Sequence, residues 1–591
     1  MSKWFEIRKG ADFKAIADKF GISPITARIL RNRELKSDEE IEKYLKCDVS
    51  MLNDPRGMED IEKGASIILE KIKEGECIRV IGDYDVDGIC SSFILVTGLR
   101  LLGGKVDYVL PDRVKDGYGL SEKLVDDAFE AGIDTIITCD NGIAAYDQIS
   151  HAKEKGMTVV VTDHHEVPFE QDTKKEILPP ADAVVDPKRS EGSCSFREIC
   201  GAVVAYKFLQ VLSDIANENE KTKDFFDEML VFAGIATVCD VMELRDENRI
   251  IVRESLKRIK NTKNRGLQAL INVNGLDASS MSAYHYGFVI GPCLNASGRL
   301  DLASRALSLF LEEDERETAR IAQDLKELND SRKDMTQQGV VKACEIVDKE
   351  AEATGSLPKV LVVYLEEVHE SIAGIVAGRI KEKYYRPTIV LTRAADGGAK
   401  GSARSIESYD MFEELSKCKE LFTKFGGHKM AAGLSLPEEN VSVLKERLND
   451  NCALTPEELV PVVRFDMVLP FNMASLDVAR ELEILEPFGT GNNKPLFAQK
   501  DVRFIEGRIL GKNRNCGKYR VSDGSGFFVL MFFGDLESFH NFLSENFGRD
   551  SVDSLYDGRG GDICIKICYS LSVNSYMGNE KAQLVMSDYS M

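Results

Sequence analysis

The sequence predicts an α/β protein: a parallel-sheet domain, long connecting helices, a smaller second α/β domain and a C-terminal β-barrel. Three observations lead to this fold class. Residues 76–305 alternate short, continuously apolar runs with segments of helix length, which is typical of a parallel sheet covered on both faces. Residues 356–465 repeat the alternation on a smaller scale. Residues from about 500 onward show only strand-like runs.

Length and composition narrow the class of protein. At 591 residues the chain is too long for one hydrophobic core, so we expect three or four domains. The start lacks the basic-then-apolar pattern of a signal peptide, and no segment approaches the roughly 20 apolar residues of a membrane helix. The fourteen cysteines form no CxxC pairs, and Cys90, Cys139 and Cys239 adjoin apolar runs. This pattern indicates reduced core thiols and a cytoplasmic protein without membrane contact.

The acidic balance limits how the protein could use nucleic acid. A net charge of −22 argues against a protein that coats nucleic acid along its length. It remains compatible with a nucleic-acid enzyme, because affinity depends on local basic residues and bound metal ions offset part of the acidity.

The N-terminal region reads as helical. A pair of helical segments joined at Gly21, with Ser23 capping the second, resembles a helix-turn-helix. The second segment carries Arg28, Arg31 and Arg33, but such helical pairs are common packing units, and we favour packing over DNA reading. The expected segments are an N-terminal helical segment 1–75, a catalytic α/β domain 76–305, a helical connector 306–355, a second α/β domain 356–465, a connector 466–499 and a nucleic-acid-binding barrel 500–591.

The strongest chemical signal is the sequence Asp-Tyr-Asp-Val-Asp-Gly at 83–88, directly after the apolar run 77–81. Alternate residues of an extended chain project to the same side, so Asp83, Asp85 and Asp87 can converge. Three close carboxylates repel one another unless cations lie among them. The pattern therefore predicts a divalent metal site at the carboxyl end of a parallel strand. A solvated acidic turn is the alternative.

The apolar runs that follow also end in metal-binding residue types. Because the carboxyl ends of parallel strands meet at one edge of a sheet, we expect these side chains to join the same pocket. Adjacent histidines after an Asp at a strand end favour a metal site over ordinary core or surface positions. The residues are Asp140 after the run 134–138, Asp163, His164 and His165 after 157–161, and Asp240 after an apolar run at 234–238 that we interpret as a further strand.

The second α/β domain contains three glycine-rich stretches. Residues 375–379 lie on a predicted helix, whereas 401–405 and 426–433 are predicted to be loops. Small residues let backbone N–H groups approach an anion, and an adjacent Arg or His supplies charge. Tight helix–strand packing is the alternative for each stretch taken alone.

The C-terminal region combines predicted strands with basic and aromatic side chains. Lys512, Arg514, Lys518 and Arg520 lie among phenylalanines and tyrosines, a composition suited to stacking on single strands. Most of these aromatic residues are expected in the barrel core.

Four motifs carry a family resemblance. The segments DYDVDG, CDNG and TDHH, with Cys239-Asp240-Val241 as a fourth, resemble the successive motifs of the DHH phosphoesterase family. Within this family the chain is similar to the RecJ exonuclease branch, over most of its length. Residues 291–300 resemble the segment that closes the DHH domain, the glycine-rich domain resembles DHHA1, and the C-terminal region resembles the OB-fold of that branch.

The resemblance implies roles for individual residues. Asp140 would bridge two Mn²⁺ or Mg²⁺ ions, Asp83 and Asp163 would orient ligands, and His165 would contact the scissile phosphate. Arginines would suit phosphate oxygens because of their planar fork. The implied metal ligands are Asp85, Asp87, Asp140, His164 and Asp240, and the implied substrate-binding residues are Arg113, Arg299, Ser402, Arg404, Gly427 and His428.

The function implied is a metal-dependent 5′→3′ exonuclease. It would degrade single-stranded DNA to 5′-mononucleotides in DNA repair and recombination, with a helicase and a single-strand-binding protein as further candidate partners. The first alternative is a DHH phosphodiesterase for cyclic dinucleotides or short oligonucleotides; a pyrophosphatase of the related family fits less well. A non-catalytic DNA-binding subunit is disfavoured, because all the acidic ligands are present.

Overall fold

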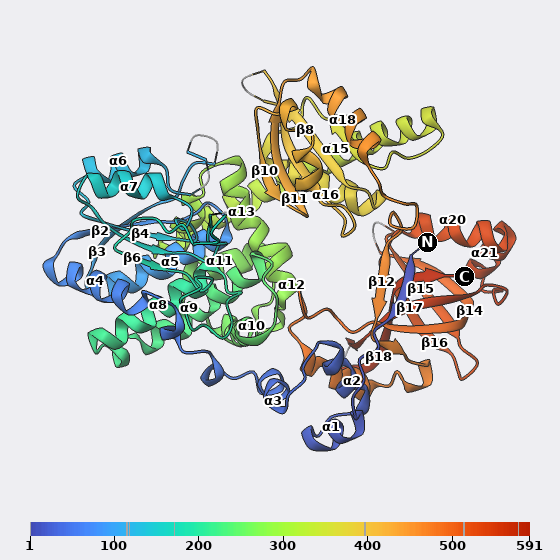
Figure 1. The fold of residues 1–591 in the computed structure, drawn as a ribbon. Coiled ribbons are helices and arrows are strands. Elements are labelled where there is room, and N and C mark those ends of the chain that lie inside the picture. The colour runs from blue at the N-terminus through green and yellow to red at the C-terminus, as the bar shows by residue number, and fades with distance from the viewer. Residues whose placement is uncertain are drawn as a thin grey trace. The chain divides into compact units, whose positions relative to one another are not determined.

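The computed structural model describes residues 2–113, 116–117, 119–170, 172–394, 397–511, 514–576 and 578–591 (Figure 1). The chain forms two compact units. One contains residues 47–453 and 489–491, and the other contains residues 1–46, 454–488 and 492–591. The segment expected at 1–75 is therefore shared between the two units.

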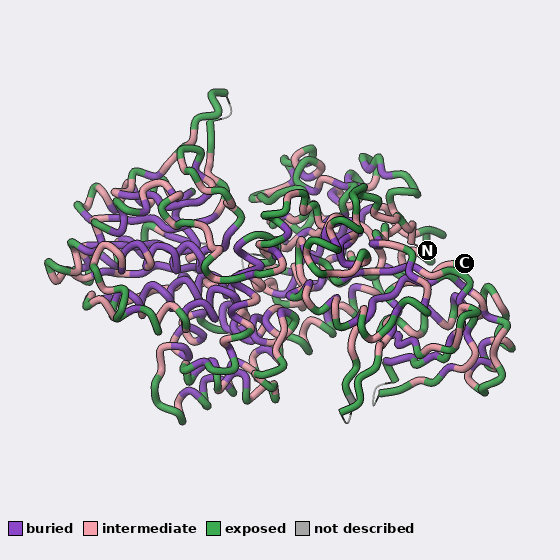
Figure 2. Tube along the Cα trace, turned by 90° about the horizontal axis from the view of Figure 1, so that it is seen from below, coloured by how far each residue is buried: buried purple, intermediate pink, exposed green. Residues whose placement is uncertain are grey.

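The larger unit begins with a parallel sheet in the order β3-β2-β4-β5-β6, and this confirms the predicted fold class. Successive residues of one strand face opposite cores: Ile136 packs with α6 and α7, whereas Ile137 packs with α5 and α8. The sheet is thus covered on both faces: β4, β5 and β6 are almost wholly buried, whereas the edge strand β3 is only partly buried. Figure 2 shows in purple how much of the chain is buried in this unit. The elements are β2 (Cys77–Ile81), β3 (Lys105–Val109), β4 (Thr135–Cys139), β5 (Thr158–Thr162), β6 (Ala183–Val185), α4 (Ile61–Glu74), α5 (Val86–Leu101), α6 (Glu122–Glu130), α7 (Tyr146–Glu154) and α8 (Gly201–Ala216).

One predicted strand of this domain is wrong. The apolar run 234–238 forms the last turns of helix α9 (Asn219–Cys239), so Asp240 follows a helix and not a strand. A continuous apolar run does not distinguish a buried strand from a buried helix, and here the apolar residues continue back to Met229. The helices that follow are α10 (Asp246–Arg258), α11 (Arg265–Val273), α12 (Ala283–His285), the π-helical turn η5 (Tyr286–Ile290), α13 (Gly291–Leu300), α14 (Ser304–Leu311) and the 40-residue α15 (Glu315–Thr354). The predicted fold class includes long connecting helices, and α15 is such a helix.

The second α/β domain has a five-stranded sheet in the order β10-β11-β9-β8-β7, in which only β7 and β8 are parallel. The stretches at 401–405 and 426–433 were predicted as loops, but they form β9, β10 and β11. Their glycines permit close approach of strands: a Cβ at Gly401 would lie 2.0 Å from the Val390 carbonyl oxygen. The elements are β7 (Leu361–Tyr364), β8 (Thr388–Arg393), β9 (Ala399–Arg404), β10 (Lys424–His428), β11 (Ala431–Leu436), α16 (Ala373–Tyr384), α17 (Met411–Ser416) and α18 (Asn440–Asn451).

The smaller unit is built on a β-barrel in the order β13-β14-β15-β16-β18-β17, closed by pairing of β14 with β17. The expectation of an all-β region is incomplete, because two helices lie between β16 and β17 and bury Phe539 and Leu543 against the barrel. The elements are β13 (Met467–Val468), α19 (Leu476–Leu482), β14 (Phe497–Leu510), β15 (Cys516–Ser522), β16 (Phe528–Phe532), α20 (Leu536–Phe547), α21 (Arg549–Tyr556), β17 (Cys564–Tyr576) and β18 (Asn579–Ser590).

The N-terminal residues belong to this smaller unit. Strand β1 (Lys3–Glu6) pairs in parallel with β12 (Val462–Phe465), and α1 (Phe13–Phe20), α2 (Pro24–Asn32) and α3 (Asp38–Lys46) follow. The arginines of α2 are engaged within the unit: Arg28 pairs with Glu6, Arg33 pairs with Asp466, and Arg31 donates to the Gly10 carbonyl. These contacts favour packing over DNA reading. Among the described helices, none combines the length and apolarity needed to span a membrane.

Candidate metal centre and phosphate site

The acidic segment after β2 turns sharply into helix α5. Asp85 caps this helix: its Oδ1 accepts hydrogen bonds from the N–H groups of Asp87 and Gly88, at 2.9 and 3.1 Å. Only glycine fits at position 88, because a Cβ there would lie 2.4 Å from the Asp83 carbonyl oxygen. The three aspartates thus lie at the carboxyl end of β2, as predicted. The predicted extended conformation is wrong, because Asp85 is the N-cap of α5 and Asp87 lies in its first turn.

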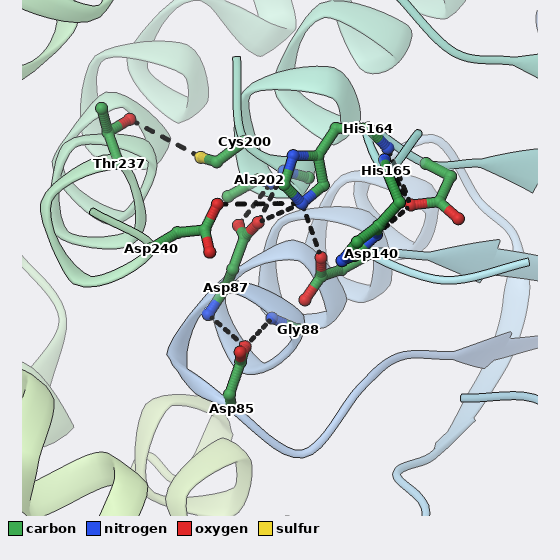
Figure 3. A network of polar contacts seen from close by, with 12 residues as sticks. Asp85, Asp87, Gly88, Asp140, His164, His165, Cys200, Ala202, Thr237 and Asp240 are labelled. Carbon is green, nitrogen blue, oxygen red and sulfur yellow. Dashed lines mark hydrogen bonds and ion pairs between the residues drawn. The ribbon is translucent and has the colours of Figure 1, made fainter. Parts of the chain in front are cut away.

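Asp87 is held by the start of a second helix. Its two carboxylate oxygens accept hydrogen bonds from the backbone N–H groups of Gly201 and Ala202, at 2.6 and 2.7 Å (Figure 3). These residues begin α8, and a helix N-terminus favours negative charge. These two hydrogen bonds therefore fix the orientation of the Asp87 carboxylate in the pocket.

Three carboxylates surround the imidazole of His164 (Figure 3). Nε2 of His164 lies 3.0 Å from Asp140, 3.5 Å from Asp87 and 3.8 Å from Asp240. Asp140 and His164 follow the adjacent strands β4 and β5, and Asp240 follows α9. The wrong prediction of a strand before Asp240 thus did not displace this residue from the site.

The acidic cluster is electrostatically strained. Burial, followed by the charges of Asp87 and Asp85, raises the pKa of Asp140 well above its usual range. The same causes raise the pKa of Asp240 to about 8. Burial and the charge of Asp85 raise the pKa of Asp83 to about 7. So many buried carboxylates are stable in their charged form only beside cations.

The donor set fits divalent cations. Ligand atoms within 4.8 Å of one another form three groups: Asp83 with Asp85 and Asp140, Asp87 with His164 and Asp240, and Asp140 with His164 and His165. Oδ1 of Asp83 and Nδ1 of His164 are buried and have no hydrogen-bond partner among the described residues. Carboxylates with imidazole suit Mn²⁺ or Mg²⁺. Asp140 and His164 each belong to two of the groups. Of these two residues, Asp140 is the one expected to be shared by two ions, because a carboxylate has two ligand oxygens.

Asp163 supports the neighbouring histidines. Its Oδ1 accepts hydrogen bonds from the His164 N–H at 2.7 Å and pairs with Nδ1 of His165 at 2.7 Å, while Oδ2 accepts the Ile143 N–H at 2.9 Å. Burial acts to raise the pKa of Asp163, but the bond to His165, its charge and the Ile143 N–H together lower it. Burial acts to lower the pKa of His165, but Asp163 overrides it and raises that pKa to about 9. His165 is therefore a cation beside the acidic cluster.

Asp186 is a functional candidate that the sequence interpretation missed. It follows the short strand β6 and is fully buried; Oδ1 accepts the Lys188 N–H at 2.7 Å, and Oδ2 has no partner among the described residues. Burial, followed by the charge of Asp163, raises the pKa of Asp186 to about 8. The signal was the same strand-end pattern, hidden because β6 has only three residues.

Four arginines from separate elements gather beside this pocket. Arg299 ends α13, and its Nη1 donates to the Ser371 carbonyl at 2.7 Å. Burial, followed by the charges of Arg113 and Arg332, lowers the pKa of Arg299 to about 10; Arg404 adds to this effect. Within the described ranges, no carboxylate forms an ion pair with Arg299, Arg332 or Arg404. Uncompensated, partly buried guanidinium groups form an anion site.

The arginine cluster is connected to the acidic cluster through Tyr84. The guanidinium of Arg113 lies over the Tyr84 ring, 4.9 Å from its centroid, and Tyr84 lies between Asp83 and Asp85. Arg404 donates to the Ser402 hydroxyl at 2.7 Å. Of the predicted substrate-binding residues, Arg113, Arg299, Ser402 and Arg404 thus come together. Arg332, on α15, also belongs to this cluster. It was not predicted, because the sequence around it is a helical segment without a recognisable motif.

Comparison with known proteins assigns the family. Family models match residues 77–235 (DHH family, N-terminal domain), 357–454 (DHHA1 domain) and 465–588 (RecJ OB domain). The chain is 32% identical over 578 residues to the single-stranded-DNA-specific exonuclease RecJ of Bacillus subtilis, covering 97% of this chain and 69% of that protein. The Escherichia coli protein of that name is 32% identical over 585 residues, covering 96% of both chains. The chain belongs to the RecJ family.

Solved RecJ structures agree with the fold. RecJ of Thermus thermophilus in complex with Mn²⁺ has a TM-score of 0.80 and 26% identity, and the match covers 100% of this chain and 79% of that one. A RecJ exonuclease bound to manganese has a TM-score of 0.58 and 31% identity, covering 68% of this chain and 96% of that one. The three-part RecJ architecture of DHH domain, DHHA1 domain and OB-fold is therefore present in this chain.

Gly427 and His428 lie apart from the contacts above. They belong to β10, the edge strand of the DHHA1 sheet, where both side-chain positions are exposed. Nδ1 of His428 accepts the Met430 N–H at 3.2 Å. In the part of the chain that the structure describes, no hydrogen bond or ion pair joins these two residues to the acidic cluster.

The OB-fold carries a second basic surface. A groove of about 270 Å³ is lined by β14, β15 and β16, and its side chains include Arg508, Lys518 and the exposed Phe527. The Arg520 guanidinium lies 4.2 Å from the centroid of the Phe527 ring. Lys512, also named from the sequence, lies outside the described residues.

Proposed function

We propose that the chain is a metal-dependent 5′→3′ exonuclease that degrades single-stranded DNA to 5′-mononucleotides, in DNA repair and recombination. One observation carries this proposal. An acidic cluster that needs cations adjoins an arginine cluster that needs anions, and Tyr84 touches both. A chain end bearing a phosphate would satisfy the arginines while the next phosphodiester reaches the acidic cluster.

The ligands proposed for Mn²⁺ or Mg²⁺ are Asp85, Asp87, Asp140, His164 and Asp240, and Asp140 is proposed as the ligand shared by two ions. Bound ions would act as Lewis acids and lower the pKa of water, which is the chemistry of two-metal phosphodiester hydrolysis. The relatives described above include RecJ structures that contain Mn²⁺, and this supports the choice of metal.

The chain's own residues have separate tasks. Asp163 holds the His165 ring by its Nδ1, so the protonated imidazole can donate from Nε2 to a non-bridging oxygen of the scissile phosphate. Asp83 would orient water within the cluster, since its buried Oδ1 has no protein partner among the described residues. The protonated His165 would also stabilise the negative charge that increases on the phosphate in the transition state.

The arginine cluster would set the mode of cleavage. A terminal 5′-phosphate would be held at a fixed distance from the scissile bond by Arg113, Arg299, Arg404 and the Ser402 hydroxyl. Such an anchor favours an exonuclease over an endonuclease. Gly427 and His428 would contribute donors from the DHHA1 domain.

The OB-fold would bind the single strand through its own surface. Its groove combines cations for phosphates with an aromatic face for bases. A helicase and a single-strand-binding protein are proposed as protein partners, and the cytoplasm as the location. The OB-fold also disfavours the alternative of a phosphodiesterase for cyclic dinucleotides, which would have no use for a surface that binds long strands.

The decisive experiment is digestion of end-labelled single strands with Mn²⁺ or Mg²⁺. We expect mononucleotides released from the 5′ end, no attack on duplex, and no product with chelator or with Asp140→Asn. A length series from dinucleotide upward separates the exonuclease, which uses all lengths, from a short-substrate phosphodiesterase. Release of internal fragments, or turnover restricted to dinucleotides, would overturn the proposal.

A further inference from the structure

Two aromatic side chains stand exposed beside each other on the DHH domain. Tyr284, in α12, is 62% exposed, and Phe288, in the π-helical turn η5, is 64% exposed. Their ring centroids are 4.9 Å apart with an interplanar angle of 21°, so the two rings are stacked. A single exposed aromatic residue is common, but a parallel exposed pair presents a flat π surface that every nucleobase can extend.

The segment that carries this pair packs tightly against the C-terminal end of helix α9. Gly287 packs against Val238: a Cβ added at Gly287 would lie 3.4 Å from a methyl carbon of Val238. Cys239 Sγ donates to the Tyr286 carbonyl at 3.5 Å, and a side chain at Gly291 would collide with the same sulfur. The residue after Cys239 is Asp240. The aromatic pair therefore belongs to the element packed against the helix that delivers Asp240 to the metal centre.

The local backbone is typical of a functional site. The π-helical turn places Tyr284 and Phe288 on one side, and such turns occur frequently at functional sites. Directly after Asp240, Val241 has φ +58° and is 65% exposed. A β-branched residue in the left-handed region is strained, and strain of this kind concentrates at active sites and ligand clamps.

The same helical run reaches the arginine cluster at its other end. Gly298 packs against the backbone of Tyr84: a Cβ added at Gly298 would lie 2.6 Å from the Tyr84 carbonyl oxygen. The next residue is Arg299. A rise of 1.5 Å per residue places Phe288 roughly 16 Å from Arg299 along the run. A strand whose terminal phosphate lies on the arginines and whose next phosphate lies in the acidic cluster would thus continue toward the Asp240 end.

We propose that the stacked pair Tyr284–Phe288 is a base-stacking platform for the single strand on the 3′ side of the scissile bond. The proposal rests on the proposed function. The occupant is a nucleobase, because the two stacked and exposed rings offer a flat π surface. The platform would hold the strand in line after each cleavage and would act on any base sequence.

The test uses the full chain and 5′-phosphorylated single strands in which one abasic nucleotide is moved along the sequence. For the wild-type protein, we expect KM to rise when the abasic nucleotide occupies the platform position and not at the neighbouring positions. The double variant Tyr284→Ser, Phe288→Ser should lose this position dependence and raise KM for long strands by about 5- to 100-fold. Its turnover of a 5′-phosphorylated dinucleotide should remain unchanged, because a dinucleotide ends before the platform.

The controls separate stacking from structure. The variant Tyr284→Phe, Phe288→Tyr keeps both rings and should keep the wild-type abasic profile. Phe129→Ser removes another exposed aromatic residue, on α6, and should leave the turnover of every substrate unaffected. Mn²⁺-dependent dinucleotide turnover by the wild type reports on the proposed function itself, independently of the platform.

Two results would overturn the platform. One is a flat abasic profile in a wild-type protein that degrades long strands. The other is a double variant whose thermal unfolding midpoint falls and whose dinucleotide and long-strand activities fall together, which would make the pair a packing element.

Discussion

Oδ1 of Asp140 lies 3.0 Å from Nε2 of His164, although the two residues come from different strands and are 24 positions apart. Asp140 has φ +59°, an unfavourable backbone conformation that turns its carboxylate into the pocket. This contact joins the groups of ligand atoms and makes Asp140 the first residue to test.

Asp140→Asn should abolish nuclease activity, lowering turnover by at least about a hundred-fold, because bound metal contributes several kcal/mol to such reactions. Removing one of several mutually repelling buried carboxylates should raise the unfolding midpoint of the metal-free protein. Mn²⁺ should no longer add stability, whereas at a hundred times Kd it adds about 2.7 kcal/mol to the wild type. Thermal unfolding with chelator and with Mn²⁺ measures both effects. Asp147→Asn, on the exposed side of α7, is the control, and wild-type turnover in Asp140→Asn would refute the shared-ligand role.

Asp163→Asn should lower kcat by roughly 10- to 100-fold, because it removes the carboxylate that orients His165 and spares the metal ligands themselves. Mn²⁺ should still stabilise this variant. His165→Asn should lower kcat similarly, and the double variant should be no worse than the worse single variant, because both changes break one unit. Steady-state kinetics of the three variants provides the measurement. If the loss of kcat in the double variant equals the product of the losses in the two single variants, Asp163 does not act through His165.

Arg404→Ala should raise KM for 5′-phosphorylated strands by about 10- to 100-fold, since a hydrogen bond to a charged group contributes about 1.5–3 kcal/mol. Strands with a 5′-hydroxyl should be affected much less, and Mn²⁺ should stabilise the variant as it does the wild type. Arg404→Lys should not restore the wild-type KM, because lysine lacks the planar fork. Arg393→Ala, on the exposed end of β8 in the same domain, is the matched control. Equal losses on phosphorylated and hydroxyl ends would contradict a terminal-phosphate role.

Asp186→Asn should stabilise the metal-free protein, and increasingly so as pH rises. The folded pKa of Asp186 is raised from 3.8 to about 8, so folding is penalised once the unfolded carboxyl ionises. Its stability cost is absent below pH 3.8, grows between about pH 4 and 8, and is constant above that range. Urea unfolding at pH 5 and pH 8.5 with chelator compares the two proteins. A constant difference between them at the two pH values would show that Asp186 does not titrate in this way.

Arg520→Glu with Phe527→Ala should weaken binding of long single strands, and the salt dependence of binding should become shallower by about one charge. Dinucleotide turnover should stay at the wild-type level, because the acidic and arginine clusters are unchanged. Fluorescence anisotropy across a salt series measures the binding. Arg559→Glu removes an exposed arginine elsewhere in the same unit and serves as control. An unchanged affinity for long strands would remove the OB groove from the binding path.

The sequence predicted the site best where metal-binding residue types directly follow an apolar run of strand length. Asp83, Asp85, Asp87 and Asp140 each follow a strand whose apolar run was read correctly, and the order of parallel strands then brings them together. Asp240 joined the site for a different reason from the one expected, since α9 delivers it. Here the residue type was a better guide than the local secondary structure.

The features that were missed depend on tertiary contacts. Gly401 and Gly427 were read as loop residues, because sequence alone does not reveal a neighbouring strand too close for a Cβ. The strand before Asp186 is too short to be recognised, and Arg332 has no local motif. Burial, followed by the charges of groups far away in the sequence, shifts the pKa values of both residues. The exposed stacking of Tyr284 and Phe288 likewise required the packing of η5 on α9.

The parallel pairing of β1 with β12 has a consequence for biosynthesis. Strand β1 ends at Glu6, whereas its partner begins at Val462, so β1 has no partner until translation has passed that residue. At roughly 5–20 residues per second, β1 waits about 20 to 90 seconds for β12. Residues 47–453 form one continuous segment of the larger unit and can fold during that wait. A chaperone that shields β1 and the helices after it on the ribosome would therefore protect the smaller unit until β12 is made.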